Sequence, residues 1–249
     1  MAKDIIIGKR FWDRSAPYFG RTRGTKFIVY PALKKLCGPV RGKTILDIGC
    51  ATGELSIYFA RKGAGVIGID FSPKMIEIAT KNSEEKGARG IKFLVVDARD
   101  LKILGEKKCD IIIINVLFPH LKQKKDIERV LMEVSGKLKS GGRFLLVEPH
   151  PCFDALLRME VFRKADGTSY FQSGKPYEFE MGIIGNKRSF KSVAYHWLIE
   201  DYTSVIQRAG LTIKKIHEPR PLKSSAQKFP EWYKEKMGYP SYIIFEIEK

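Results

Sequence analysis

The sequence lacks several features that would assign it to a class of protein at once. No apolar run approaches the roughly 20 residues of a membrane span, and the N-terminus has neither the apolar segment nor the cleavage site of a signal peptide. The four cysteines show no C-x-x-C spacing, which argues against a zinc site or a disulfide framework. We therefore expect a cytoplasmic protein without a metal site.

Acidic and amide side chains are also scarce. The chain has 45 Lys and Arg against 28 Asp and Glu, a net charge of +17, and its Asn and Gln together number only seven. Such an excess of positive charge attracts nucleic acid or an anionic substrate. It is equally typical of a lysine-rich thermophile-like surface. Both interpretations stay open on composition alone.

What the sequence does contain is a regular alternation of strands and helices. The apolar runs predict five strands, at 43–49, 65–70, 91–98, 109–115 and 143–149. Helices are predicted between them, at 53–63, 71–87 and 126–142, and Gly141 and Gly142 stop the last of these. A further helix at 198–210 and strands at 211–218 and 241–248 follow, with a loop predicted from 218 to 240. This alternation is typical of an α/β fold with a doubly wound parallel sheet.

The turn after the first strand, in L-D-I-G-C-A-T-G-E, is unsuited to a dinucleotide. Ala51 and Glu54 stand where the fingerprint G-x-G-x-x-G has its second and third glycines. Because Glu54 opens the helix, its charge would cancel the positive helix end that a pyrophosphate needs. The turn therefore predicts a ligand that is not a diphosphate.

Polar residues end each of the first four predicted strands, where ligands of an open α/β sheet bind. They are Asp47, Asp70, Asp97 and Asn115. Asp70 suits two ribose hydroxyls and Asp97 an exocyclic amine, while Asp47 with the backbone at Gly49 suits an ammonium group. Gly53 would let the helix come close. A ligand with an amine, a ribose and an adenine but no phosphate is S-adenosyl-L-methionine.

These motifs resemble the class I S-adenosylmethionine-dependent methyltransferases. The resemblance rests on D-x-G-C-x-x-G at 47–53, on Asp70 and on V-V-D-A-R-D-L at 95–101. The stretches at 11–20 and 196–219 are similar to the branch that contains the ubiquinone and menaquinone biosynthesis enzymes. The resemblance implies a Rossmann-like seven-stranded sheet in which only the last strand is antiparallel. The cofactor contacts that we predict are Tyr18, Asp47, Gly49, Cys50, Gly53, Asp70, Phe71, Asp97, Ala98 and Asn115.

We expect three parts: an N-terminal helical cap at 1–40, a core at 41–151 and 197–249, and an inserted substrate lid at 152–196 that is rich in aromatic residues. Trp12 and Tyr18 either cover the cofactor or pack on the sheet. The lid either walls an apolar acceptor pocket or packs on itself.

The candidates for catalysis are His120, His150 and His196, and for each a purely structural role is the alternative. Glu148 is expected to orient structure. The sequence has no N-P-P-Y motif after the fourth strand, and its Pro-Cys pair at 151–152 follows the fifth strand instead of the fourth. We therefore predict methyl transfer to a small-molecule or lipid-like acceptor. Methylation of RNA or protein through the basic surface is the alternative, followed by a cofactor-binding protein without catalysis.

Overall fold

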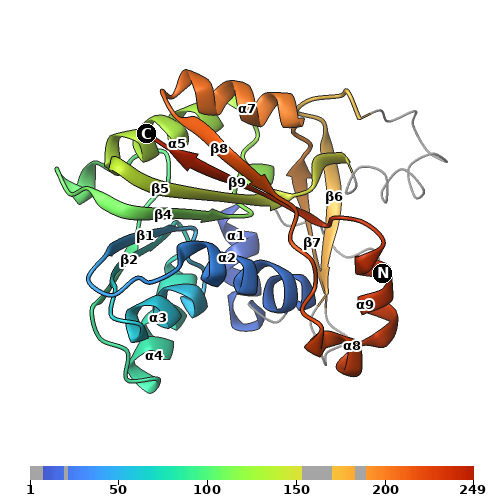
Figure 1. Cartoon of the computed structure of the whole chain (residues 1–249), viewed down its shortest axis with the longest axis horizontal. Coiled ribbons are helices and arrows are strands. Elements are labelled where there is room, and N and C mark those ends of the chain that lie inside the picture. Colours follow the sequence, from blue (N-terminus) through green and yellow to red (C-terminus); the bar gives the residue numbers. More distant parts are fainter. Residues whose placement is uncertain (1–7, 20–21, 153–169, 183–188) are drawn as a thin grey trace.

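The computed structural model describes residues 8–19, 22–152, 170–182 and 189–249 (Figure 1). Its centre is a seven-stranded sheet with the strand order β3-β2-β1-β4-β5-β9-β8. The strands are β1 (Thr44–Ile48), β2 (Gly65–Asp70), β3 (Ile91–Val95), β4 (Cys109–Asn115), β5 (Leu138–Pro149), β8 (Thr212–His217) and β9 (Tyr242–Glu248). The first five are parallel to one another, and β9 runs antiparallel to both β5 and β8. The predicted seven-stranded sheet with an antiparallel last strand is confirmed.

Strand β4 shows why this sheet is covered on both faces. Its side chains alternate between two buried clusters: Ile111 and Ile113 lie in one, and Ile112 and Ile114 in the other. A central parallel strand buried on both sides needs such a continuous apolar run. Helices α2 (Tyr30–Cys37) and α3 (Glu54–Arg61) cover the first face, and α5 (Lys124–Lys137) and α7 (Ile199–Arg208) cover the second (Figure 1). Helix α4 (Pro73–Glu85) follows β2 and contacts β2, β3, α1 and α3.

Two elements differ from the sequence prediction. Helix α5 ends at Lys137, before the two glycines, because Leu138 already pairs with Cys109 and begins β5. The predicted loop at 218–240 contains helices α8 (Ser224–Lys228) and α9 (Pro230–Met237). Pro230 pre-organises the first turn of α9, and the rings of Phe229 and Trp232 pack on Phe27 with centroids 5.6 and 6.3 Å away.

Two further segments lie at the carboxyl ends of the parallel strands. One is N-terminal: α1 (Lys9–Ser15), η1 (Ala16–Tyr18) and the π-helix η2 (Thr25–Val29). The other is the antiparallel hairpin of β6 (Pro176–Gly182) and β7 (Ser189–Tyr195), which forms a separate two-stranded sheet. Phe11 of α1 and Phe179 of β6 bring them together, with ring centroids 5.6 Å apart. Residues 1–7 and 20–21 of the predicted cap, and 153–169 and 183–188 of the predicted lid, lie outside the described residues.

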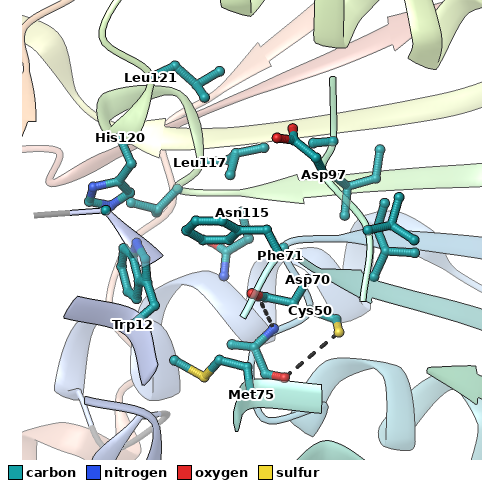
Figure 2. A pocket seen from close by; sticks show the side chains of 18 of the residues that line it. Trp12, Cys50, Asp70, Phe71, Met75, Asp97, Asn115, Leu117, His120 and Leu121 are labelled. Carbon is teal, nitrogen blue, oxygen red and sulfur yellow. Dashed lines mark hydrogen bonds between the residues drawn. The ribbon is translucent and has the colours of Figure 1, made fainter. Parts of the chain in front are cut away.

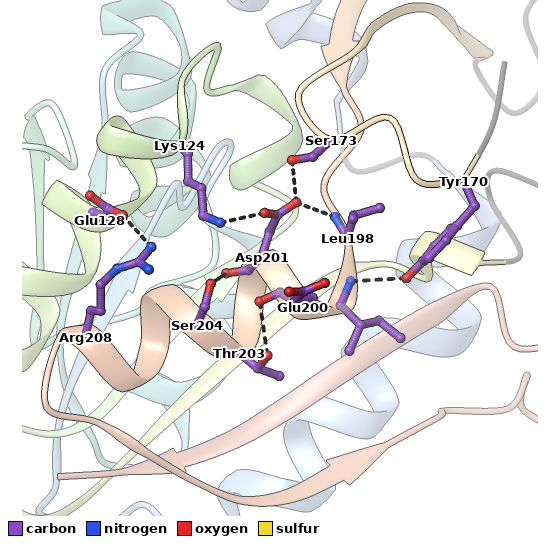
Figure 3. Close-up of polar contacts among 11 residues, drawn as sticks. Lys124, Glu128, Tyr170, Ser173, Leu198, Glu200, Asp201, Thr203, Ser204 and Arg208 are labelled. Atoms are coloured by element: carbon purple, nitrogen blue, oxygen red, sulfur yellow. Dashed lines mark hydrogen bonds and ion pairs between the residues drawn. The ribbon is translucent and has the colours of Figure 1, made fainter.

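Asp201, in the first turn of α7, connects the residues just before β6 to the core (Figure 3). One carboxylate oxygen lies 2.6 Å from Nζ of Lys124 at the start of α5. The other accepts hydrogen bonds from Oγ of Ser173 at 2.6 Å and from the Leu198 N–H at 2.9 Å. Burial alone would raise the pKa of Asp201, but these bonds outweigh it and hold the pKa below its usual value.

Among the residues that the structure describes, no helix combines the length and the apolar character that crossing a bilayer requires.

Candidate functional site

A cavity of about 350 Å³ lies at the carboxyl ends of β1, β2 and β4, which is the usual ligand position in an open α/β sheet (Figure 2). Nine residues predicted for the site line it: Asp47, Gly49, Cys50, Asp70, Phe71, Asp97, Ala98, Asn115 and His120. Figure 2 shows Trp12 and His120 together on one side of the cavity, with Asp70, Cys50 and Asp97 on the other. The cavity thus joins a polar wall, built from strand ends, to an aromatic wall.

The glycine turn after β1 is folded tightly over the end of β2. The N–H groups of Gly49 and Cys50 both donate to the carbonyl of Ile69, at 2.8 and 2.9 Å. Gly49 and Gly53 have φ of +74° and +77°, and Ala51 also has a positive φ of +48°. A Cβ on Gly53 would lie 2.8 Å from the Phe93 ring and 3.0 Å from Cβ of Ala79. Gly53 is therefore required by the turn and by helix packing, and it does not line the cavity.

Two carboxylates form the centre of the polar wall, Asp47 buried and Asp70 half-buried. Asp47 is 3% exposed and accepts a hydrogen bond from Oγ of Ser56 at 2.5 Å. Asp70 accepts from the N–H groups of Ala51 at 3.1 Å and Ser72 at 2.9 Å. Burial raises the pKa of each aspartate to about 6, against the opposing effect of these hydrogen bonds. A pair of desolvated acceptors favours a ligand that brings positive charge and hydroxyl or ammonium donors.

Asn115, at the end of β4, adds a third acceptor at this wall. Its Oδ1 is buried and has no hydrogen-bond partner among the described residues. Since buried polar atoms are normally satisfied, an orphaned acceptor that lines a cavity points to a bound ligand.

Asp97 differs from the other two aspartates. It lines the cavity with its side chain 44% exposed. The Arg99 guanidinium donates two hydrogen bonds to it, with Nη2 2.6 Å from Oδ2 and Nε 3.0 Å from Oδ1. Arg99 also lies 3.3 Å from Asp126. Hydrogen bonds from Arg99 hold the pKa of Asp97 below its usual value. This carboxylate is engaged with a cation that the sequence analysis did not assign to the site.

The aromatic wall surrounds His120. Its imidazole packs edge-on against Trp12, with centroids 4.7 Å apart, and against Phe179 at 5.4 Å. Phe19 also packs edge-on against Trp12, with ring centroids 5.6 Å apart. Burial in these apolar surroundings lowers the pKa of His120 to about 4. The imidazole is therefore neutral at pH 7 and is able to accept a hydrogen bond, and as a base it is weaker than a free imidazole.

Comparison with known proteins fits this geometry. The sequence model of the family described as "Methyltransferase domain" matches residues 39–195, more than half of the chain. The chain belongs to this methyltransferase family. That confirms the family resemblance and the prediction that the protein is an enzyme.

Three similar proteins show how much of the chain the similarity covers. An uncharacterised protein of Haemophilus influenzae is 26% identical over 216 residues, covering 84% of this chain and 81% of the relative. A demethylmenaquinone methyltransferase of Lactococcus lactis is 34% identical over 168 residues, covering 66% and 60%. The crystal structure of an S-adenosylmethionine-dependent methyltransferase of Mesorhizobium loti superposes with a TM-score of 0.63 at 20% identity, covering 88% and 96%. The chain spans only 60% of the length of its quinone-pathway relative, so the match leaves the acceptor undetermined.

The remaining residues predicted for the site of the methyltransferase do not line the cavity. His150 is buried, with Nε2 3.1 Å from Oε1 of Glu218. His196 directs its Nε2 to the Tyr170 carbonyl at 2.8 Å. Tyr18 ends η1, while the neighbouring Phe19 lines the cavity instead.

Several lining residues of the methyltransferase were not identified from the sequence. They include Phe19, Tyr30, Arg99, Ser192, Val193 and Tyr195. Three of these come from β7, and the alternation in S-F-K-S-V-A-Y predicts a strand there but not which residues face a ligand. Within the described residues, no group of three His, Cys, Asp or Glu side chains is placed to hold a metal ion.

Proposed function

We propose that this methyltransferase transfers the methyl group of S-adenosyl-L-methionine to a small-molecule or lipid-like acceptor by in-line displacement. One observation carries the proposal: a single cavity joins the aspartates at the strand ends to the aromatic wall around His120. A cofactor at the polar wall would therefore share the cavity with an acceptor bound at the aromatic wall.

The polar wall fits the cofactor. Asp70 would accept the ribose hydroxyls, and Asp47 with the backbone at Gly49 would receive the ammonium group. The orphaned Oδ1 of Asn115 is a further acceptor on this wall. Phe71 and Ala98 line the same cavity and offer apolar surface for an adenine ring. When bound, the cofactor supplies a methyl group on a sulfonium, which is already an activated leaving group.

The protein's part in the reaction is to position the acceptor and to exclude water. Trp12 and Phe19 from the N-terminal segment close the cavity from one direction, and Ser192 and Tyr195 of β7 from another. His120 stands between them as a neutral imidazole. It would accept the proton of an acceptor hydroxyl, which matters only where the acceptor is protonated at working pH.

The Lactococcus relative supports an aromatic acceptor, since its name describes methylation of a menaquinone precursor. A quinone-like ring suits a chamber walled by Trp12, Phe19 and Tyr195. The second candidate, methylation of RNA or protein, is motivated by the net charge of +17.

The two candidates are separated by labelling. The protein is incubated with S-adenosylmethionine that carries a labelled methyl group and with a cell extract split into small-molecule, lipid, RNA and protein fractions. Label in the small-molecule or lipid fraction is the expected result. Label in RNA or protein, with turnover that falls steeply as salt rises, would replace the proposal with the second candidate. Tight cofactor binding without turnover on any fraction would indicate a non-catalytic protein.

A further inference from the structure

Glu148 is a buried titratable residue that the proposed reaction does not use. It lies next to the end of β5, it is 0% exposed, and it is not a lining residue of the cavity. Its Oε1 accepts a hydrogen bond from the Phe118 N–H at 3.1 Å, and its Oε2 has no partner among the described residues. Burying a carboxyl group in a core costs free energy, so its hydrogen bond to Phe118 needs an explanation.

That contact is one half of a clamp on the Phe118 backbone, by which we mean hydrogen bonds to both its N–H and its carbonyl. While Glu148 receives the Phe118 N–H, the indole Nε1–H of Trp197 donates to the Phe118 carbonyl at 3.1 Å. Both clamping residues come from other parts of the chain, β5 and the segment before α7. The Phe118 side chain is itself fully buried and stacks on Tyr202 with centroids 6.2 Å apart and planes inclined by 23°.

The clamped peptide begins the short helix η4 (Phe118–His120), which ends at the histidine of the aromatic wall. The helix is closed by the Leu121 N–H, which donates to the same Phe118 carbonyl at 3.0 Å. Just before it, Val116 has φ of +57°, a conformation that a β-branched residue adopts only when its surroundings impose it. The Val116 N–H donates to the Val147 carbonyl of β5 at 2.8 Å. The path from β4 to His120 is thus bent sharply and then held at Phe118.

We propose that Glu148 is a positioning residue for the acceptor site: with Trp197 it fixes the backbone of Phe118 and thereby directs the His120 imidazole into the cavity. The proposal deepens the proposed function, because the placement of His120 matters for catalysis only if the acceptor binds beside it.

The state of the carboxyl group agrees with this role. Burial raises the pKa of Glu148 well above its usual value, and the backbone N–H groups of Phe118 and Leu117 offset only part of that. A glutamine has nearly the same shape as this carboxyl group and keeps an oxygen that accepts the Phe118 N–H, and this provides a conservative variant.

The test measures His120 directly, without an acceptor. The imidazole signals of histidine-labelled protein are followed by NMR, and a His120→Gln variant identifies those of His120. The variants are Glu148→Gln, which keeps an oxygen for the Phe118 N–H, and Glu148→Leu, which removes it. Trp197→Phe opens the other side of the clamp. Val147→Ala, a fully buried neighbour on β5 in the opposite core cluster, is the control for general loss of packing.

We expect Glu148→Gln and Val147→Ala to keep the His120 signals and their titration midpoint, about 4, at the wild-type position. Glu148→Leu and Trp197→Phe should move the signals and raise the midpoint by about one pH unit or more, as the ring leaves its apolar surroundings. If Glu148→Leu does not fold, Trp197→Phe and Glu148→Gln still carry the test. Wild-type His120 signals in a folded Glu148→Leu or in Trp197→Phe would overturn the proposal, and so would a Glu148→Gln variant as perturbed as Glu148→Leu.

Calorimetric titration with S-adenosylhomocysteine separates this proposal from the proposed function. The clamp variants should bind it within about threefold of the wild type, because the clamp does not touch the strand-end aspartates. Failure of the wild type to bind would contradict the proposed function and leave the NMR result intact.

Discussion

The polar and aromatic walls of the cavity are built in different ways. Asp47, Gly49 and Asp70 belong to β1 and β2 or to the turns that leave them, and hydrogen bonds to backbone groups fix them locally. Trp12, His120 and Ser192 come from three distant segments and meet only through packing. A wall defined by the sheet has little freedom to move, whereas one assembled from distant segments depends on the contacts that hold those segments together. We therefore expect mutations in the first wall to affect cofactor binding and those in the second to affect acceptor turnover.

The sharpest test of this division is Asp70→Ala. It removes the acceptor proposed for the ribose and exposes the N–H groups of Ala51 and Ser72, so cofactor affinity should fall by about a thousandfold, or about 4 kcal/mol. Isothermal titration with S-adenosylhomocysteine measures this. The control is Asp110→Ala at the opposite end of the sheet, where the carboxylate likewise accepts a backbone N–H, that of Thr44 at 2.7 Å. Unchanged binding in Asp70→Ala would refute the cofactor assignment.

Gly53→Ala tests whether the polar wall depends on the backbone of the turn. The new Cβ meets the Phe93 ring at 2.8 Å in a residue with φ of +77°, so unfolding stability should fall by about 3 kcal/mol. Gly105→Ala separates the two causes, because Gly105 has φ of +56° with nothing within 4 Å of its Cβ. That variant should lose only about 1 kcal/mol in urea denaturation. Equal losses in the two variants would mean that the close approach of the helix is unimportant.

Substitution at the aromatic wall should lower acceptor turnover and leave cofactor affinity nearly unchanged. His120→Ala should lower turnover of the acceptor by about a hundredfold while the affinity for S-adenosylhomocysteine stays within about threefold. Steady-state rates measured with the labelled cofactor, alongside calorimetry, give both quantities. His217→Ala is the matched control, since that imidazole ends the edge strand β8, pairs with Glu246 of β9 and does not line the cavity. Wild-type turnover in His120→Ala would make His120 a structural residue.

The same contrast explains what could be predicted from the sequence. The strands themselves and the positions of Asp47, Asp70 and Asn115 follow from local patterns, because a polar residue that ends a buried parallel strand must lie at the carboxyl edge of the sheet. Their hydrogen-bond partners are less local: the Asp70 carboxylate bonds to Ser72, two residues later, but also to Ala51 in the turn after β1.

From the sequence, the aromatic wall could be predicted only as a segment rich in aromatic residues, without the positions that face the cavity. Tyr30 and Ser192 reach the cavity because an N-terminal helix and the hairpin fold over it, and no spacing in the sequence specifies such packing. The predicted end of α5 was wrong for a related reason. Gly141 and Gly142 are local stop signals, but pairing of Leu138 with β4 ends the helix before them. Arg99 was also missed: it pairs with Asp97 only two residues away, but its second ion pair, with Asp126, joins residues on either side of β4.

Asp201→Asn tests whether the aromatic wall depends on its attachment to the core. The variant weakens the bonds to Lys124 and Ser173 (Figure 3), so we expect a loss of about 2 kcal/mol in unfolding stability and slower turnover with unchanged cofactor affinity. Glu128→Gln is the control, because its ion pair with Arg208 joins the same two helices but is exposed. That variant should lose at most about 0.5 kcal/mol. Equal losses would remove any special role for the Asp201 network.

The smallest expected effect, about tenfold, is the pH dependence of cofactor binding. Asp47 and Asp70 have pKa values of about 6 in the free protein, so both are protonated at pH 5 and ionised at pH 7.5. Because a cationic amine and hydroxyl donors bind the ionised form, affinity for S-adenosylhomocysteine should fall by about tenfold in total between pH 7.5 and 5. Titrations in buffers of different ionisation enthalpy should show proton release on binding near pH 6.

The free protein should show the reverse trend in stability. A carboxyl group whose pKa is higher in the folded chain than in the unfolded chain contributes stability that is complete below about pH 4 and is lost as the pH rises through about 6. Asp47→Asn cannot ionise, so without ligand it should resist urea better than the wild type at pH 7.5 and about equally at pH 4.5. It should also bind the cofactor more weakly at pH 7.5. If wild type and variant keep the same stability difference at both pH values, the polar wall does not hold strained carboxylates, and the contrast between the two walls loses its electrostatic basis.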